Sequence, residues 1–500
     1  MPRTYTRRAI GGYWFPLTYL AAQDQDLQFA AMTLRGWLIC CALLVPAPAW
    51  AQRASAPPAR RPNVLFIIAD DLRAAADGFG DTAAQTPNLD RLARAGLRFT
   101  RAYAQYPVCN PSRVSMLTGM RPETAGVLSN SVFFRSVLPD VVTLPQLFKQ
   151  HGYFSASLGK VFHRGQTMED MKSDWADEKS WSHIRIYQAT DIGNRGEGRS
   201  MAGAEAPWCR WLAADGADED QPDGMIAGEA VRLLRESRDA PFFLAVGFHK
   251  PHDPFIAPKK YFDQYRVDAM RLAVDPPGRS PDPPLAIPNA YGRFASFTDR
   301  ERREFTRAYL AGTSFMDAQV GKLLDVLDER KLWDNTIVVF LGDHGYHLGE
   351  RGWWNKDTLF ELSARAPLLV HAPGMRAAGQ RTASLVEFVD LYPTLVELAG
   401  LRAPHRLEGV SLKPLFDRPA RQVKDAAFTV VARNGGKNIG RTVRTDRWRY
   451  TEWDEGRSGV ELYDHRVDPG EYHNVAARPG LSGEIAKLKR MLASGGRKSR

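Results

Sequence analysis

The chain alternates apolar runs with amphipathic segments, and this alternation restricts the fold more than any other feature of its 500 residues. Nearly continuous apolar strands are typical of a sheet that is buried on both faces. The runs are NVLFIIADD from Asn63, YFSASLGKVFH from Tyr153, PFFLAVGFHKPH from Pro241, TIVVFLGDHG from Thr336 and APLLVHAPG from Ala366.

Helical patterns lie between these runs, at residues 86–99, 224–237, 315–333 and 389–401. The alternation predicts an α/β fold with a large, mainly parallel sheet flanked by helices. After residue 421 the pattern changes to short alternating runs, which predict a smaller antiparallel sheet, followed by a last helix at residues 482–494. Residues 165–207 and the proline-rich stretch 267–292 are expected to be loops.

The N-terminal region predicts export. From Met32, which we expect to be the true start, the chain has a basic residue, a short apolar run and an A-x-A cleavage site ending at Ala51. The run is too short for stable membrane insertion. We expect export by the Sec machinery to the periplasm or beyond. The alternative to a start at Met32 is that residues 1–31 are a genuine extended leader. The predicted division is leader and signal peptide 1–51, linker 52–62, catalytic domain 63–420, and C-terminal subdomain with basic tail 421–500.

Charge and cysteine content exclude some classes of function. The net charge of +10 comes without zinc-finger spacing, an RNA-recognition signature or a long basic run, so nucleic acid is not an expected partner. The excess suits either an ordinary solvated surface or a mild preference for anionic ligands. After signal cleavage only Cys109 and Cys209 remain, and they could form one disulfide.

Polar clusters follow the apolar runs, where the carboxyl ends of parallel strands collect ligands. Asp70, Asp71 and Asp343 are three such carboxylates. Hard oxygen ligands favour Ca²⁺ or Mg²⁺, whereas helix capping explains one aspartate better than three. Successive residues of a strand point to opposite faces, so Asp70 and Asp71 can share a metal only if the chain turns there.

Cys109 precedes PSRVSML and therefore lies at or near a helix N-terminus, which favours anions and thiolates. Arg113, Lys160 and Lys356 are candidate anion holders. A metal, several cations and one nucleophilic position together predict transfer of a phosphoryl or sulfuryl group.

The segment CNPSRVSMLTG resembles the signature of the type I sulfatases, which belong to the alkaline phosphatase superfamily. The resemblance extends from Asn63 to Ala476. The motifs GKVFHRG, GFHKPHDPF and GDHGYHLGERGWWNK are similar to those of the iduronate-2-sulfatase branch.

This resemblance implies that a maturation enzyme oxidises Cys109 to formylglycine, whose hydrate attacks sulfur with help from Asp343. It implies that His249, together with Lys356, protonates the departing oxygen. It also implies that His163 takes the proton of the second hydroxyl, after which the aldehyde reforms. Arg113, Lys160 and Lys356 would hold the sulfate. The implied Ca²⁺ ligands are Asp70, Asp71, Asp343, His344 and the modified Cys109.

The expected substrate is a sulfated saccharide, with a 2-O-sulfated uronic acid at a non-reducing end as the specific prediction. Lys250 or His252 would face the uronate carboxylate, although Lys250 also suits an ordinary surface lysine. Three alternatives remain. They are a phosphonate or phosphate ester hydrolase, an inactive sulfated-polysaccharide-binding protein, and an enzyme that uses unmodified Cys109 as a thiol.

Overall fold

The computed structural model describes residues 61–74, 83–163, 177–201, 208–236, 238–288, 294 and 296–495. The predicted leader, signal peptide, most of the linker and the basic tail after residue 495 lie outside these ranges. None of the helices in the described ranges combines the length and the apolar character needed to cross a membrane.

The centre of the fold is an eight-stranded sheet with the order β12-β2-β11-β10-β1-β8-β4-β5. Its middle strands run parallel, as predicted, because β1 pairs in parallel with both β10 and β8, and β4 with both β8 and β5. Strand β11 is antiparallel to β10 and to β2. The bounds are β1 (Asn63–Asp70), β2 (Leu97–Phe99), β4 (Phe154–Gly159), β5 (His183–Arg185), β8 (Phe242–Pro251), β10 (Thr336–Gly342), β11 (Leu368–His371) and β12 (Arg381–Thr382).

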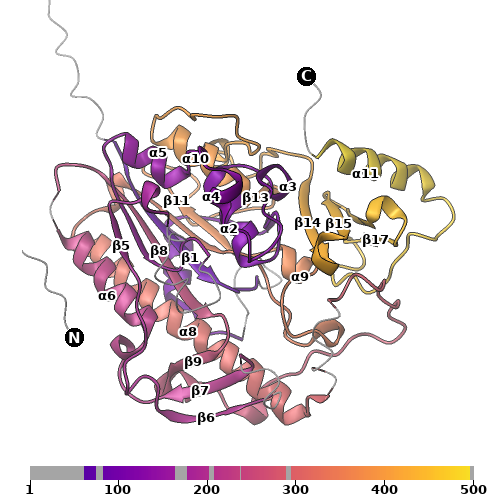
Figure 1. The fold of residues 1–500 in the computed structure, drawn as a ribbon, viewed down its shortest axis with the longest axis horizontal. Coiled ribbons are helices and arrows are strands. Elements are labelled where there is room, and N and C mark those ends of the chain that lie inside the picture. The colour runs from indigo at the N-terminus through magenta and orange to yellow at the C-terminus, as the bar shows by residue number, and fades with distance from the viewer. Residues whose placement is uncertain are drawn as a thin grey trace, which may run out of the picture. The chain divides into compact units, whose positions relative to one another are not determined.

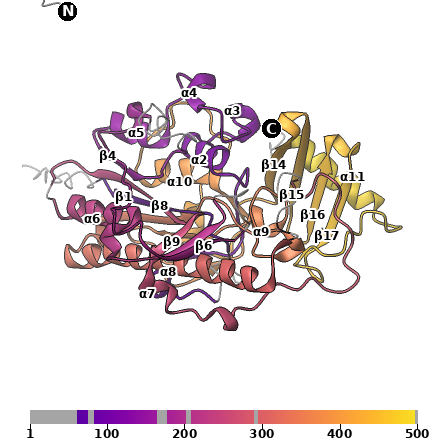
Figure 2. The ribbon, with the colours of Figure 1, turned by 60° about the horizontal axis from the view of Figure 1, so that its bottom comes forward.

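Both faces of the sheet are covered by helices, which explains why its central strands are nearly continuous apolar runs. In β1, Val64, Phe66 and Ile68 face one core, and Leu65 and Ile67 face the other. Figure 1 and Figure 2 show the helices on the two sides. The first core includes α2 (Cys109–Thr118), α5 (Leu144–Gln150) and α10 (Leu391–Leu398), and the second includes α1 (Pro87–Ala95), α6 (Pro222–Arg235) and α8 (Asp299–Glu329).

A separate four-stranded antiparallel sheet near the C-terminus confirms the second predicted element of the fold. Helix α11 (Ser482–Ser494) lies beside this sheet in Figure 1. It packs on the sheet through Leu488 and Leu492. The strands are β14 (Ala427–Arg433), β15 (Asn438–Arg444), β16 (Trp448–Trp453) and β17 (Val460–Asp464). The domain boundary at residue 421 stays a prediction.

Smaller elements complete the described part of the chain. Two minor sheets have the orders β13-β3 and β6-β7-β9. Their strands are β3 (Ala102–Tyr103), β6 (Gly196–Ser200), β7 (Arg210–Ala214), β9 (Phe255–Pro258) and β13 (Val386–Glu387), and the short helices are α3 (Pro122–Ala125), α4 (Phe134–Val137), α7 (Lys259–Phe262) and α9 (Glu361–Ala364).

Three predicted elements need correction. The helix expected at residues 86–99 ends at Ala95, and residues 97–99 form β2. Gly96 lies between the two elements. A side chain does not fit there, because a Cβ would lie 2.7 Å from the carbonyl oxygen of Val370. Helix α8 begins at Asp299 instead of 315, after a capping box made by Thr298 and Glu301. The expected loop at 165–207 contains β5 and β6.

Candidate active site

The candidate site forms where four neighbouring strands of the large sheet end. Asp70 is the last residue of β1, and His249 lies near the end of β8. Lys160 follows β4, and Asp343 follows β10. These strands are adjacent in the order β10-β1-β8-β4, so the polar side chains that follow the apolar runs meet at one edge. Cys109 reaches this edge as the first residue of α2 and is fully buried.

The chain turns at Asp71, which is the condition for two adjacent aspartates to face one site. The β1–β8 register shifts after Ala69, and Asp71 has a φ of +63°. The Asp71 backbone N–H donates to Asp343 Oδ1 over 3.1 Å, so the turn is tied to the end of β10. Ligand atoms of Asp70 and Asp71 then lie within 4.8 Å of each other and of the Cys109 sulfur.

Position 109 lies between two lysines and one carboxylate, since Asp70 Oδ1 is 3.3 Å from Cys109 Sγ. The Lys356 and Lys160 Nζ atoms lie 3.3 and 3.6 Å from Cys109 Sγ. Burial alone would raise the pKa of the Cys109 thiol, but these two ammonium groups, with hydrogen bonds to His163 and His252, hold it well below its ordinary value. Cys109 and Cys209 are both free and buried, so the disulfide considered from the sequence is absent.

The three predicted anion holders each contact a carboxylate. Lys160 pairs with Asp70, and Lys356 pairs with Asp71. Arg113 Nε lies 2.8 Å from Asp343 Oδ2, and Arg113 also donates to the carbonyl oxygens of Lys160 and Val161. Arg113 therefore orients Asp343 and the end of β4. Because three cations accompany the three aspartates, repulsion between the carboxylates does not by itself require a metal.

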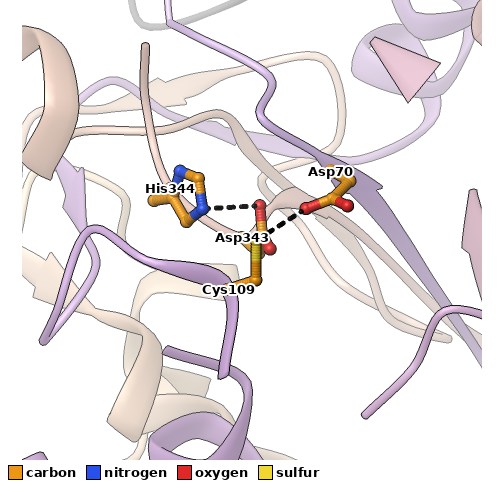
Figure 3. A group of neighbouring side chains, drawn as sticks. All are labelled: Asp70, Cys109, Asp343 and His344. Atoms are coloured by element: carbon orange, nitrogen blue, oxygen red, sulfur yellow. Dashed lines mark hydrogen bonds and ion pairs between the residues drawn. The ribbon is translucent and has the colours of Figure 1, made fainter. Parts of the chain in front are cut away.

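The donor set nevertheless fits a divalent cation. Asp70, Cys109, Asp343 and His344 offer ligand atoms that all lie within 4.8 Å of one another, and Figure 3 shows them converging. Asp71 Oδ2 and His344 Nε2 are buried without a hydrogen-bond partner in the part of the chain that the structure describes. Buried polar atoms are rarely left unsatisfied, so these two point to a ligand. Burial raises the pKa of Asp343 to about 6.

Two histidines that face the site, His249 and His252, contact different carboxylates. His249 Nδ1 lies 3.0 Å from Asp223 Oδ1, and Asp223 is buried at the start of α6. His252 Nε2 lies 3.7 Å from Asp71 Oδ2. Burial opposes the charged form of His252, but the carboxylate of Asp71 outweighs it and raises its pKa to about 9. Burial lowers the pKa of His163.

Lys250 is a buried residue, which corrects the surface alternative considered from the sequence. Its Nζ donates to the carbonyl oxygens of His252 and Pro254 over 2.8 and 2.7 Å. The ammonium group therefore holds the turn that carries His252. Burial lowers the pKa of Lys250.

A cavity of about 650 Å³ opens beside these side chains. Its wall combines basic, neutral polar and apolar groups, and includes three carboxylates that pair with basic residues of the site. The residues that frame it are Asp70, Asn130, Lys160, His163, Tyr187, Gln188, Gln221, Asp223, His249, Lys250, His252 and Asp253.

Asp223 was missed by the sequence interpretation. It lies in QPDG, one residue before the predicted helix at 224, where an acidic residue suits the first turn of any helix. No residue pattern connects it with His249. The site roles assigned to individual residues stay predictions, although the structure brings together all the predicted side chains.

A sequence model of the sulfatase family matches residues 62–401. The chain belongs to the sulfatase family. A second model, N-sulphoglucosamine sulphohydrolase C-terminal, matches residues 349–498. Mouse iduronate 2-sulfatase is 32% identical over 83% of this chain and 90% of its own length. The chain is thus a sulfuric ester hydrolase similar to the iduronate-2-sulfatase branch.

Solved structures with the same fold include two informative cases. The phosphonate monoester hydrolase of Agrobacterium radiobacter has a TM-score of 0.72 and 24% identity, with 87% of this chain and 95% of that chain covered. A 2-O GAG sulfatase has a TM-score of 0.66 and 24% identity, with 87% and 92% covered. At this level of sequence identity, the structural similarity establishes the fold alone. The fold is alkaline phosphatase-like.

Proposed function

We propose that the enzyme removes the 2-O-sulfate of a uronic acid residue at the non-reducing end of a sulfated polysaccharide or glycosaminoglycan. The observation that carries this proposal is the cavity of about 650 Å³ next to position 109, whose wall includes Lys160 and three histidines. Its volume suits a ligand of the size of a sugar unit. The similarity to mouse iduronate 2-sulfatase supports the choice of sugar and sulfate position.

The chemistry requires two groups that the chain is suited to hold. When present, formylglycine made from Cys109 supplies a hydrated aldehyde as nucleophile, and Ca²⁺ held by Asp70, Asp71, Asp343 and His344 supplies positive charge beside it. Lys160 and Lys356 lie 3.6 and 3.3 Å from the Cys109 sulfur, so they stabilise charge on the atom at this position and on the sulfate next to it. Losing one such donor typically costs roughly 3 kcal/mol of barrier.

Proton transfer falls to the histidines in this proposal. His249 lines the cavity and donates a proton to the departing sugar oxygen. His163, which interacts with Cys109, accepts a proton from the group at that position. Arg113 contributes by orienting Asp343, since its guanidinium pairs with that carboxylate.

Recognition of the uronate carboxylate needs a revised assignment. Of the two candidates, Lys250 and His252, the lysine is already engaged, because its ammonium group donates to two carbonyl oxygens. His252 remains, with an imidazole on the cavity wall whose Nε2 lies 3.7 Å from Asp71 Oδ2. The 2-O-uronate assignment therefore draws mainly on the similarity to iduronate 2-sulfatase.

Two partners belong to this proposal besides the saccharide. A maturation enzyme converts Cys109, and the Sec machinery exports the chain, which then begins at Gln52. Mass spectrometry of the exported protein should find Gln52 at its N-terminus, and should find formylglycine at position 109. An intact thiol in fully active protein would instead support the thiol alternative.

The substrate assay compares 2-O-sulfated uronate disaccharides with 6-O-sulfated neutral and amino sugars. We expect a higher kcat/KM on the uronates, and the opposite order would overturn the substrate while leaving the sulfatase activity intact. Aryl sulfate, phosphate and phosphonate esters assayed in parallel test the reaction class. Preference for the phosphorus esters would favour the hydrolase alternative, and absence of all turnover by matured enzyme would favour a binding protein.

A further inference from the structure

We propose that Asp223 is a positioning residue that holds His249 in the orientation and tautomer needed to protonate the departing oxygen. The inference rests on the acid role of His249 in the proposed function. The two residues come from different elements, since Asp223 lies in the first turn of α6 and His249 near the end of β8.

Asp223 contacts the end of β8 through both carboxylate oxygens. Oδ1 accepts from the His249 backbone N–H over 2.8 Å and lies 3.0 Å from His249 Nδ1. Oδ2 accepts from the Lys250 backbone N–H over 2.9 Å. The carboxylate thus fixes the backbone and the imidazole of His249 at the same time.

The position of Asp223 favours its negative charge even though the side chain is buried. The first turn of a helix presents free N–H groups and the positive end of the helix dipole. Gly224 allows this turn to come close to the preceding segment, because a Cβ there would lie 1.8 Å from the carbonyl oxygen of Asp218.

A carboxylate at Nδ1 selects the tautomer with hydrogen on that nitrogen, so the exchangeable proton of the acid is on Nε2. In the reaction the S–O bond to the sugar breaks while sulfur bonds to the attacking oxygen. The electron pair stays on the sugar oxygen, which takes the Nε2 proton. His249 passes from imidazolium to neutral imidazole and keeps its Nδ1 contact with Asp223 Oδ1.

The test uses the dependence of rate on the leaving group. A sugar alkoxide needs a proton as it departs, whereas 4-nitrophenolate is stable without one. Each variant is assayed on 4-nitrophenyl sulfate and on the sugar sulfate that the wild-type enzyme hydrolyses best. The variants are Asp223→Asn, His249→Gln and the control Asp218→Asn, a nearby buried carboxylate that contacts Tyr261 and Gln319 instead.

General acids contribute about 10²- to 10⁴-fold, so His249→Gln should lose this much on the sugar ester and far less on the aryl ester. Asp223→Asn should show the same selectivity, with a loss of about 10- to 100-fold on the sugar ester, as is typical when a group that orients a histidine is changed. Asp218→Asn should leave the ratio of the two activities unchanged.

The outcomes separate the inference from the function on which it rests. Equal losses of Asp223→Asn on both esters, with a selective loss in His249→Gln, would overturn the positioning role alone. Equal losses in His249→Gln would overturn the acid role, and the inference with it. If Asp223→Asn does not fold, ¹⁵N-histidine NMR of the wild-type enzyme decides. The resonances missing in His249→Gln should show a protonated Nδ1, and a neutral Nε2–H tautomer would contradict the proposal.

Discussion

Arg433, at the end of β14, should be required for both stability and turnover because it holds the loop that carries Lys356. Its Nη2 donates to the carbonyl oxygen of Asp357, and its Nη1 lies 3.0 Å from Asp357 Oδ1. The Asp357 backbone N–H in turn donates to the Pro107 carbonyl oxygen over 3.1 Å, two residues before Cys109. Arg433→Met removes this support while keeping a long side chain.

The size of the effect follows from burial. The Arg433 side chain is 7% exposed and that of Asp357 is 27% exposed. Removing one partner of a buried ion pair lowers the free energy of unfolding by about 3–5 kcal/mol. Because Asp357 is partly exposed, we expect the lower end of this range, about 3 kcal/mol. Unfolding entropy of about 2.1 cal/mol/K per residue over the compact unit Ala59–Arg500 makes this a Tm loss of only about 3 °C. A misplaced Lys356 should lower kcat about tenfold, which is about 1.4 kcal/mol of barrier.

The assay measures kcat at 25 °C, where both proteins stay folded, and Tm by calorimetry. Arg441→Met is the control, because Arg441 makes a surface pair with Glu123 in which the side chains are 32% and 43% exposed. Such pairs contribute about 0–1 kcal/mol. If Arg433→Met kept the kcat of the control while losing Tm, the proposed link between β14 and Lys356 would be wrong.

Two further perturbations test the metal and a buried acid. Chelation should lower both activity and Tm, with recovery on adding Ca²⁺, since it leaves the buried Asp71 Oδ2 and His344 Nε2 without a hydrogen-bond partner. An unchanged rate and Tm would refute the site. Asp343→Asn should lower kcat more strongly than it lowers Tm. Burial raises the pKa of Glu461 from 4.5 to about 7. Its protonated form is therefore favoured by folding, and the stability it contributes below pH 4.5 is lost as the pH rises through 7. The free energy of unfolding of Glu461→Gln, measured in urea, should thus rise relative to that of the wild type between pH 5 and pH 8. If the two free energies had the same pH dependence, this prediction would be contradicted.

The sequence predicted the buried strands well because each of them carries apolar residues on both faces. Strands β1 and β10 begin at Asn63 and Thr336, where their apolar runs begin. The direction of β11 could not be predicted, since parallel and antiparallel strands in a buried sheet have the same apolar pattern. Strand β6, GEGRS, is exposed along its whole length and has no apolar residue that would mark it.

The site was predictable to the extent that its residues follow strands or belong to a motif. Asp70, Lys160 and Asp343 follow apolar runs, whereas the significance of Cys109 and His344 came from the resemblance. The burial of Lys250 and the contact between Asp223 and His249 were not predictable. Both depend on how α6 and the turn after β8 pack together, which local residue patterns do not encode.

The C-terminal sheet supports the active site through contacts that lie next to the nucleophilic position. In β14, the Val430 N–H donates to the Gln105 carbonyl oxygen over 2.9 Å, and the Ala432 N–H donates to the Tyr106 hydroxyl over 2.8 Å. Residues 105–108 lead directly into Cys109 and α2. Arg433 of the same strand holds the segment after Lys356. Strand β14 therefore contacts both the segment that leads into Cys109 and the segment that carries Lys356. The active site therefore depends on the C-terminal sheet for its geometry, although the predicted ligands and proton donors all precede it in the sequence.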